Sequence, residues 1–455
     1  MKAQEVQSLL LRVPDGPAVA HLIVRVPEGS GRAAVCLLKQ LSASFGPQPP
    51  EQPCFSIGFS FAGLEALGLP DAYLRLFRSL APAFSEGAVR RSVHLGDSGL
   101  SAAQHWRPAF RQDRAHVLLS WHGAPATVRG QANDFAELWK KTFDTWPADP
   151  LEGLRLGAPG QHVGQWVHFG YRDGISEVCI DDELPRPTAP DCRRHAPGAL
   201  LLGEVNDAGA NPFVLSRSPD KVRAFFKDSS FGILRPMAQD LAAFEAQVDR
   251  GLAIATLVGA PERRDFVKAK MNGRWPNGAL PRPGDLSATG PLTLDLARDD
   301  AGEGCPFGSH VRRMRAAPDA QGHRFERPLQ RRSIPFGPAA WSGRPTDGVQ
   351  RGLLGHFFCA SIEDQFEHLL DQWAARAPLG FDPQDSALDP LIGPHDDANA
   401  ALAVPLKGRP TQWLKGFGAW TTTLGTLYAW HPGRVGLQAL IDDDFVAAED
   451  EAPWL

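Results

Sequence analysis

Two halves of the chain show the same succession of strand-like and helix-like segments, and this repetition limits the fold more than any other feature. The first half contains strand-like apolar runs at 18–26, 54–61 and 114–121 and helical patterns at 33–45 and 133–144. Asn133 is the expected N-cap of the second helix. Strands that alternate with helices predict βαβ units.

The second half restarts this succession after an interruption. Strand-like runs lie at 229–237 and 352–362, and helical patterns lie at 237–253, 261–273 and 363–375. Between the halves, a proline-rich stretch from Leu184 to Ala210 has no clear periodicity and is the best candidate for a boundary. Because 455 residues exceed the size at which one hydrophobic core stops growing, we expect two domains, residues 1–200 and 201–455.

Composition and charge limit the range of possible functions. Hydrophobic residues make up 43% and charged residues 22% of the chain, as in globular proteins. The formal net charge of -5 offers no basic surplus for nucleic acid, so we expect a small-molecule partner. No apolar run is long enough to span a membrane, and we expect no membrane partner.

The cysteines and the N-terminus suggest a location. The six cysteines are at least thirteen residues apart, which excludes zinc-ribbon and thioredoxin spacings, and no CxxCH motif for covalent haem is present. The N-terminal segment MKAQEVQSLLLRVPDG has no signal-peptide pattern. We therefore expect free thiols in a reducing, cytoplasmic compartment.

One carboxylate stands in an unusual setting. The stretch GYRDGIS, residues 170–176, follows the apolar, strand-like run WVHFG and places Asp173 between two glycines. An Asp-Gly turn is the simpler interpretation, because Asp bonds to its own backbone and Gly accepts positive φ. A role in chemistry needs support from elsewhere in the chain.

Two later stretches supply that support. In GCPFGSHVRRMRA, residues 304–316, His310 precedes three arginines. A lone histidine is often structural, but neutral imidazole is a good axial ligand for haem iron, and Arg312, Arg313 or Arg315 could meet the haem propionates. A solvated charged run is the alternative for these arginines. In RPLQRRSIPFGP, residues 327–338, an arginine pair precedes a small apolar segment.

These three stretches, in this order, resemble the dye-decolourising peroxidase family. Asp173 matches the distal aspartate of the family's GxxDG motif, His310 its proximal iron ligand and Arg331 its distal arginine. Ser309 stands where the family more often has Ala. Near the C-terminus, Gly355 and His356 replace the usual RGLLF continuation.

The resemblance implies a fold and a cofactor. The expected fold class is α+β, with two ferredoxin-like domains, each a mainly antiparallel sheet flanked by helices. One non-covalent haem b per chain would be held mainly by the C-terminal domain. Its contacts would include His310, Arg312, Arg331 and, as a distal apolar wall, Leu354 and Phe357.

The resemblance also implies an activity, the reduction of hydrogen peroxide to water with oxidation of dyes, phenols or other organic donors through an oxo-iron(IV) porphyrin radical. Asp173 would move the proton between the peroxide oxygens, favoured at acidic pH, and Arg331 would stabilise the negative charge that develops. His310 would donate from its other ring nitrogen to a carboxylate, for which Glu363 and Asp364 are the candidates.

Alternatives remain at this stage. A haem carrier or sensor, or a haem-demetallating protein, could use the same pocket. A protein without haem, in which Asp173 and His310 are structural, would be colourless. A carrier has no need of both Asp173 and Arg331, and this favours catalysis. The sequence does not identify the reducing substrate or the oligomeric state.

Overall fold

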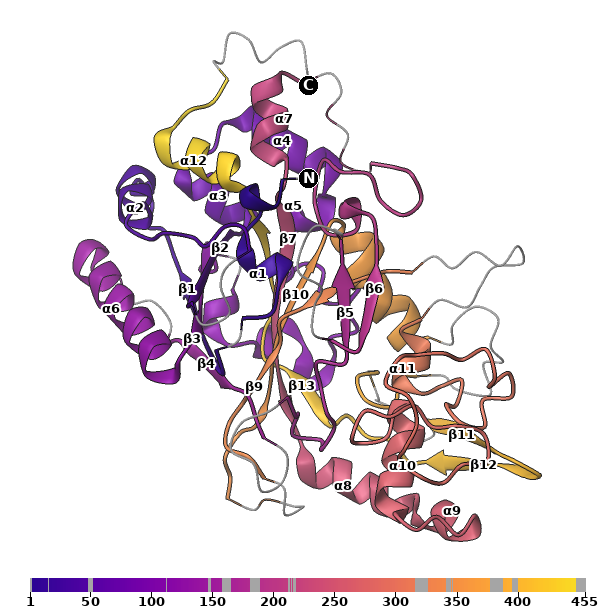
Figure 1. The fold of residues 1–455 in the computed structure, drawn as a ribbon. Coiled ribbons are helices and arrows are strands. Elements are labelled where there is room, and N and C mark those ends of the chain that lie inside the picture. The colour runs from indigo at the N-terminus through magenta and orange to yellow at the C-terminus, as the bar shows by residue number, and fades with distance from the viewer. Residues whose placement is uncertain are drawn as a thin grey trace.

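The fold was analysed in a computed structural model of the full chain. The structure describes residues 2–14, 16–47, 52–111, 113–145, 149–157, 165–180, 189–211, 213, 215, 218–315, 326–340, 345, 347–376, 388–394 and 400–446. One large sheet and the helices around it form the centre of the fold (Figure 1).

The N-terminal half forms one ferredoxin-like repeat. Its strands are β1 (Ala18–Val24), β2 (Cys54–Phe59), β3 (Val117–Gly123) and β4 (Leu151–Leu154), in the spatial order β4-β1-β3-β2 with antiparallel neighbours. Helices α2 (Gly31–Leu38) and α6 (Pro125–Phe143) connect β1 to β2 and β3 to β4. The predicted βαβ units are therefore present, each split by one antiparallel strand.

The C-terminal half repeats this arrangement. Its strands are β7 (Ser230–Gln239), β8 (Gln330–Arg331), β9 (Ile334–Phe336), β10 (Gly352–Cys359), β13 (Thr421–Thr423) and β14 (Leu427–His431). The spatial order β14-β7-β10-β8 has the same pattern, and β14 pairs with β2, so the repeats share one sheet. The predicted ferredoxin-like α+β class is confirmed. The boundary at residue 200 stays a prediction.

Helices cover this sheet and build a separate lobe (Figure 1). The longer ones near β2 and β14 are α3 (Phe61–Leu67), α4 (Asp71–Leu80), α5 (Pro82–Glu86), α7 (Asp220–Phe226) and α12 (Arg434–Asp442). The lobe contains α8 (Leu241–Arg250), α9 (Leu252–Leu257), α10 (Arg263–Asn272) and a hairpin of β11 (Ala401–Leu406) and β12 (Arg409–Lys415). It has its own apolar core around Phe244 and Trp275.

Shorter helical elements complete the fold. They are α1 (Ser8–Leu11), α11 (His310–Arg313), the π-helical turns η6 (Ile362–Glu367) and η7 (Leu369–Ala374), and the 3-10 turns η1 (Ala3–Glu5), η2 (Gly99–Ser101), η3 (Ala103–His105), η4 (Pro108–Phe110) and η5 (Pro197–Ala199). The helix predicted at 363–375 is therefore wound as π turns. Asn133 is not an N-cap, because α6 begins at Pro125, where Pro suits the first helical turn.

The sheet curls so that its two ends meet. Strand β4, at one end, packs against β9 and β10 at the other. At this seam, Val19, Ile334 and Leu354 form a small buried apolar cluster. The segment around α1 packs against the strands as part of a further buried cluster that includes Leu9 and Phe358. The curled sheet therefore encloses side chains, as a small barrel does.

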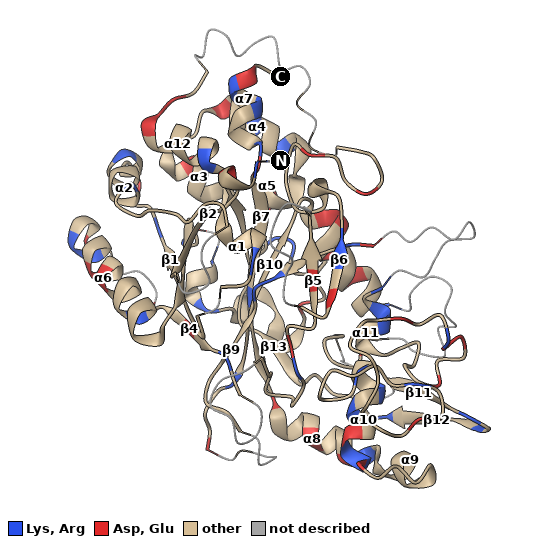
Figure 2. Cartoon of the chain, viewed as in Figure 1, with Lys and Arg blue, Asp and Glu red and all other residues tan. Residues whose placement is uncertain are grey.

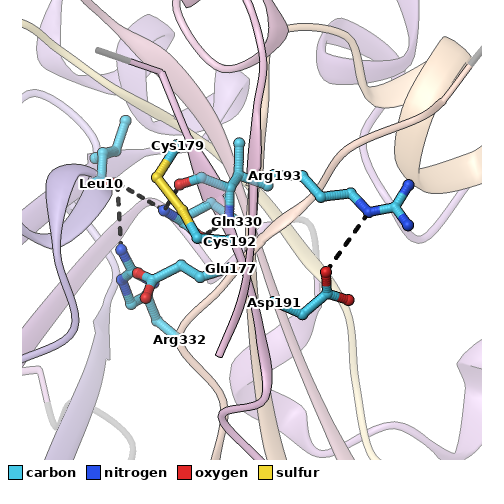
Figure 3. Close-up of a disulfide and its surroundings, with 9 residues drawn as sticks. Leu10, Glu177, Cys179, Asp191, Cys192, Arg193, Gln330 and Arg332 are labelled. Atoms are coloured by element: carbon cyan, nitrogen blue, oxygen red, sulfur yellow. Dashed lines mark hydrogen bonds and ion pairs between the residues drawn. A yellow bond between two sulfur atoms is a disulfide. The ribbon is translucent and has the colours of Figure 1, made fainter. Parts of the chain in front are cut away.

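A disulfide corrects one prediction. Strands β5 (Ser176–Cys179) and β6 (Asp191–Arg194) form a separate parallel pair, and Cys179 is bonded to Cys192 (Figure 3). The prediction that all thiols are free is wrong for these two cysteines. The spacing of the two cysteines in the sequence did not reveal the bond, because the bond depends on how the fold brings their Cα atoms to 6.2 Å.

Within the described ranges, the structure has no helix of the length and apolarity that a membrane span needs.

Candidate active site

A cavity of about 470 Å³ lies between the C-terminal half of the sheet and the segments that follow the GxxDG turn. His310, Asp173 and Arg331 all line it, although they are far apart in sequence. The apolar part of the lining includes Phe357, Phe366, Leu369, Leu370 and Ile392. The three predicted polar residues therefore face one shared, partly apolar space.

His310 is held by a buried carboxylate. Its Nδ1 lies 2.9 Å from Oδ2 of Asp389, whose side chain is fully buried. The other carboxylate oxygen of Asp389 accepts hydrogen bonds from the backbone N–H groups of Leu391 and Ile392. An Asp that accepts from Nδ1 leaves Nε2 of His310 with its lone pair free for a ligand.

The surroundings of Asp389 stabilise its ionised form. Burial acts to raise the pKa of this carboxyl, but His310, Arg313 and the N–H group of Leu391 outweigh burial and hold the pKa below its usual value. The ionised acceptor therefore persists at neutral pH, and the imidazole keeps a fixed orientation.

The two carboxylates predicted for this role lie elsewhere. Glu363 accepts a hydrogen bond from the backbone N–H of Ala83 at 2.5 Å, and Asp364 is exposed and bonds to Ser361. Those predictions are wrong, because the carboxylate at Nδ1 of His310 is that of Asp389. Asp389 lies in an irregular segment without periodicity, so no sequence signal indicated it.

The loop before His310 is fixed by buried contacts. Lys270 donates to the carbonyl oxygens of Glu303 and Gly304, and burial lowers its pKa to about 8. Arg312 donates to the carbonyl of Cys305 at 2.8 Å and stacks on Phe307. Arg312 therefore supports the loop and does not line the cavity, whereas Arg315 does.

The GxxDG turn is anchored to the other half of the chain. Tyr171 donates to the carbonyl of Lys268, and the N–H of Arg172 donates to the carbonyl of Pro276. Gly170 and Gly174 have φ values of +80° and +70°, which confirms why the turn needs glycine. The preceding WVHFG run, predicted as a strand end, forms only an isolated bridge at Trp166 and then a turn.

The distal pair lies at the more open part of the cavity. Nη2 of Arg331 is 3.9 Å from Oδ1 of Asp173, and the two side chains are 44% and 36% exposed. Arg331 also approaches the carbonyl of Ser176 at 3.4 Å. This exposure makes the pair accessible to water and to a small molecule in the cavity.

Strand β10 shows which apolar residues face the cavity. Leu353 and Phe357 line it, whereas Leu354 belongs to the buried cluster at the seam of the sheet. Successive strand residues point to opposite faces, so the predicted wall residue Leu354 points the other way. Both faces of β10 carry large apolar residues, and the sequence therefore could not distinguish them.

The lining suits a haem. Seven arginines and five carboxylates line the cavity, so it carries a cationic surplus that fits two propionates. Arg315 and Arg193 share Asp191 and Glu326 at one end, and β5 and β6 bring both signs of charge there (Figure 2). Together with the free nitrogen of His310 and the apolar walls, these residues fit the group.

Fold and site together define a protein of two ferredoxin-like repeats with a haem-sized cavity between a histidine and an Asp–Arg pair. No family model matches the chain. It is 28% identical over 365 residues to dye-decolorizing peroxidase msp1 of Mycetinis scorodonius, covering 74% of this chain. It is 26% identical over 398 residues to dye-decolorizing peroxidase AauDyP1 of Auricularia auricula-judae, covering 77% of this chain and 70% of that protein.

Solved structures agree on the fold. A dye-decolorizing peroxidase in complex with 2,6-dimethoxyphenol superposes with a TM-score of 0.74 and 22% identity, covering 97% of this chain and 99% of that one. A DyP-type peroxidase of Anabaena sp. gives a TM-score of 0.70 at 18% identity, covering 96% and 94%. The chain is a relative of the dye-decolourising peroxidases and has their fold. The match spans 65% of the length of msp1.

Proposed function

We propose that the chain is a haem-dependent peroxidase that reduces hydrogen peroxide to water and oxidises dyes, phenols or other organic donors. One observation carries the proposal. A cavity of about 470 Å³ has the His310–Asp389 pair and the Asp173–Arg331 pair in its lining, as peroxide chemistry on a bound haem requires. When bound, a non-covalent haem b would supply the iron and the redox chemistry.

His310 is the residue that would bind the iron, through Nε2. Because Nδ1 is hydrogen-bonded to the buried Asp389, the imidazole is held in one tautomer and one orientation. Arg315 and Arg331 would bind the propionates, with Leu353 and Phe357 as apolar wall. Arg312 would act on His310 only through the loop that it supports.

Asp173 is the proposed acid-base group for peroxide. A carboxylate can take the proton from one peroxide oxygen and return it to the other if both are within hydrogen-bond reach. Arg331 keeps its charge at any working pH and would stabilise negative charge as the O–O bond breaks. Its guanidinium lies 3.9 Å from Oδ1 of Asp173, so both groups would act on the same small molecule.

The proposal is tested in two steps. Purified chain reconstituted with haemin is expected to show a Soret band that shifts or weakens in His310→Ala, and an unchanged spectrum would disprove the assigned ligand. Stopped-flow mixing with peroxide is expected to show oxidation at least 100-fold slower in Asp173→Asn or Arg331→Leu, in the range typical of a lost acid-base or charge-stabilising group. Parent rates in both variants would disprove the mechanism.

The alternative is a haem-binding carrier, sensor or demetallating protein. A Soret band that depends on His310, combined with no peroxide reaction, would favour it. The cytoplasmic location expected from the sequence also stays a prediction. Disulfides persist more readily in oxidising compartments, so the redox state of Cys179 in cells bears directly on that location.

A further inference from the structure

Four buried histidines cross the interior of the curled sheet, away from the cavity. His21 on β1 and His122 on β3 come from the N-terminal repeat, and His356 on β10 and His431 on β14 come from the C-terminal repeat. Neighbouring ring centroids are 6.0 Å apart for His122 and His21, 5.2 Å for His21 and His356, and 5.7 Å for His356 and His431. We call these residues the histidine row.

The row joins strands that are not neighbours in the sheet. Strands β1 and β10 are separated by β3, β2, β14 and β7 along the sheet, yet His21 and His356 are in edge-to-face contact. This contact lies beside the seam where β4 meets β9 and β10, near the apolar cluster of Val19 and Leu354. The row therefore crosses from β1 to β10 at the place where the two ends of the curled sheet meet.

The four imidazoles are almost completely buried and make few hydrogen bonds. Each of the four is at most 1% exposed. His21 and His431 use Nδ1 for contacts with Ser120 and Ser56. Five ring nitrogens, Nε2 of all four and Nδ1 of His356, have no hydrogen-bond partner among the described protein atoms. Such nitrogens are costly when buried, and a proton on them would be costlier still.

Among the described residues, the charged side chains that act on the row are arginines. Arg332, between β8 and β9, is buried against the row and is paired with Glu177 of β5 at 3.0 Å (Figure 3). Arg155, just after β4, adds a second cation near His122, and Cys54 of β2 is a buried thiol. Among the described residues, no group of three His, Cys, Asp or Glu side chains is arranged to hold a metal ion.

We propose that the histidine row is an acid-sensitive latch. With neutral imidazoles it closes the seam between β1 and β4 on one side and β9 and β10 on the other. Protonation introduces several like charges into an interior that already contains the buried Arg332 and has Arg155 nearby, and this opens the seam before the rest of the sheet unfolds. The latch is independent of haem and of the proposed peroxidase activity.

The direction of the pH effect follows from burial. Burial lowers the pKa of His21 and of His431 to about 3, and lowers the pKa of His122 and His356 well below the usual value. In the opened or unfolded chain these residues titrate near pH 6.5. The opened state therefore binds more protons, and closure is fully stable above about pH 6.5 and weakens as pH falls below it.

The first experiment measures urea unfolding of the full-length chain between pH 7.5 and 5 by tryptophan fluorescence. At the acidic end of this range, each neutral buried histidine is expected to raise the unfolding equilibrium constant about tenfold for each unit by which the pH falls. His356→Gln is expected to reduce the slope by about one proton, and His94→Gln, at an exposed histidine, is expected to leave it unchanged. His122→Gln replaces His356→Gln if that variant does not fold.

The second experiment separates a latch from general acid instability. Hydrogen exchange at pH 7 and pH 5, corrected for intrinsic rates, is expected to show early loss of protection at pH 5 in β1, β4, β9 and β10, with β2 and β14 still protected. Simultaneous loss in all strands would overturn the latch. An identical proton slope in His356→Gln and the parent chain would overturn the role of the row.

Discussion

At the scale of single residues, the hydrogen bond from His310 to Asp389 decides how the proposed iron ligand is oriented. Asp389 is fully buried and bonds to one side chain and two backbone N–H groups. The backbone N–H of Asp389 also donates to the carbonyl of Ala374 in η7. Asp389 therefore connects η7 to the imidazole. A substitution at Asp389 therefore alters the orientation of His310 without changing a residue that lines the cavity.

We predict that Asp389→Asn weakens haem binding about 10- to 100-fold, as loss of a partner that orients a metal ligand does. Asparagine has a single acceptor oxygen, which cannot serve both Nδ1 of His310 and the N–H groups of Leu391 and Ile392, so the imidazole loses its fixed tautomer. Haem transfer from the loaded protein to apomyoglobin measures the change. Asp364→Asn, at the exposed carboxylate on η6, is the matched control and should transfer haem at the parent rate. Equal rates in both variants would contradict the assignment.

At the scale of elements, the turn that presents Asp173 depends on its glycines. We predict that Gly170→Ala costs about 1–2 kcal/mol of unfolding free energy, because φ is +80° there and a Cβ atom is strained in that region. The nearest obstacle is only the tip of Lys268, so backbone strain is the main cost. Chemical denaturation measures it.

Gly130 provides the control for that prediction. It lies inside α6, without positive φ and with open space where a Cβ would stand. Gly130→Ala should be neutral or should stabilise the helix by about 0.5–1 kcal/mol. If both substitutions have the same effect, the turn does not need the left-handed conformation.

The disulfide supports another element, the β5–β6 pair. Each strand has only four residues, and an isolated two-stranded pair is marginal in water. We predict that the double variant Cys179→Ser, Cys192→Ser loses about 3 kcal/mol of unfolding free energy, since the bond closes a short loop of 13 residues. Urea denaturation with and without reductant measures the loss. Cys36→Ser, at an exposed free thiol, should cause no change.

At the scale of the whole molecule, a buried ion pair in the wall of the cavity connects the two halves of the chain. Arg235 of β7 forms two hydrogen bonds to Asp97, at 2.6 and 2.9 Å, and Thr423 donates to the same carboxylate. Asp97 follows α5 in the N-terminal half. Both side chains are buried. The pair therefore holds the N-terminal half against the sheet of the C-terminal half.

We predict that Asp97→Asn destabilises the fold by about 3–5 kcal/mol, because it leaves the Arg235 charge buried without its partner. Thermal or urea unfolding measures the loss. Glu152→Gln breaks the exposed pair with Arg129 and should have no measurable effect, as is usual for surface pairs. A loss below 1 kcal/mol for Asp97→Asn would mean that water replaces the carboxylate.

The sequence alone predicted much of this molecule. The strands at β1, β2, β3, β7 and β10 followed from apolar runs, because a strand and its local pattern share the same few residues. The motifs around Asp173, His310 and Arg331 were recognised through their resemblance to a family; the three residues line one cavity, and their roles stay predictions. The repeated succession of elements indicated two similar halves, and the shared order of strands bears this out.

Only the tertiary structure decided which residues meet. Asp389 follows His310 by 79 residues and carries no pattern of its own. Leu353 and Leu354 are alike in sequence, and only the sheet decides which one faces the cavity. The Cys179–Cys192 bond and the histidine row also depend on strands brought together by the fold. Helices, strands and short motifs depend mainly on residues that are neighbours in the sequence, so they could be predicted from it. The pairing of distant residues depends on the packing of the whole chain. For that reason the sequence determined the motifs, and only the tertiary structure determined their partners.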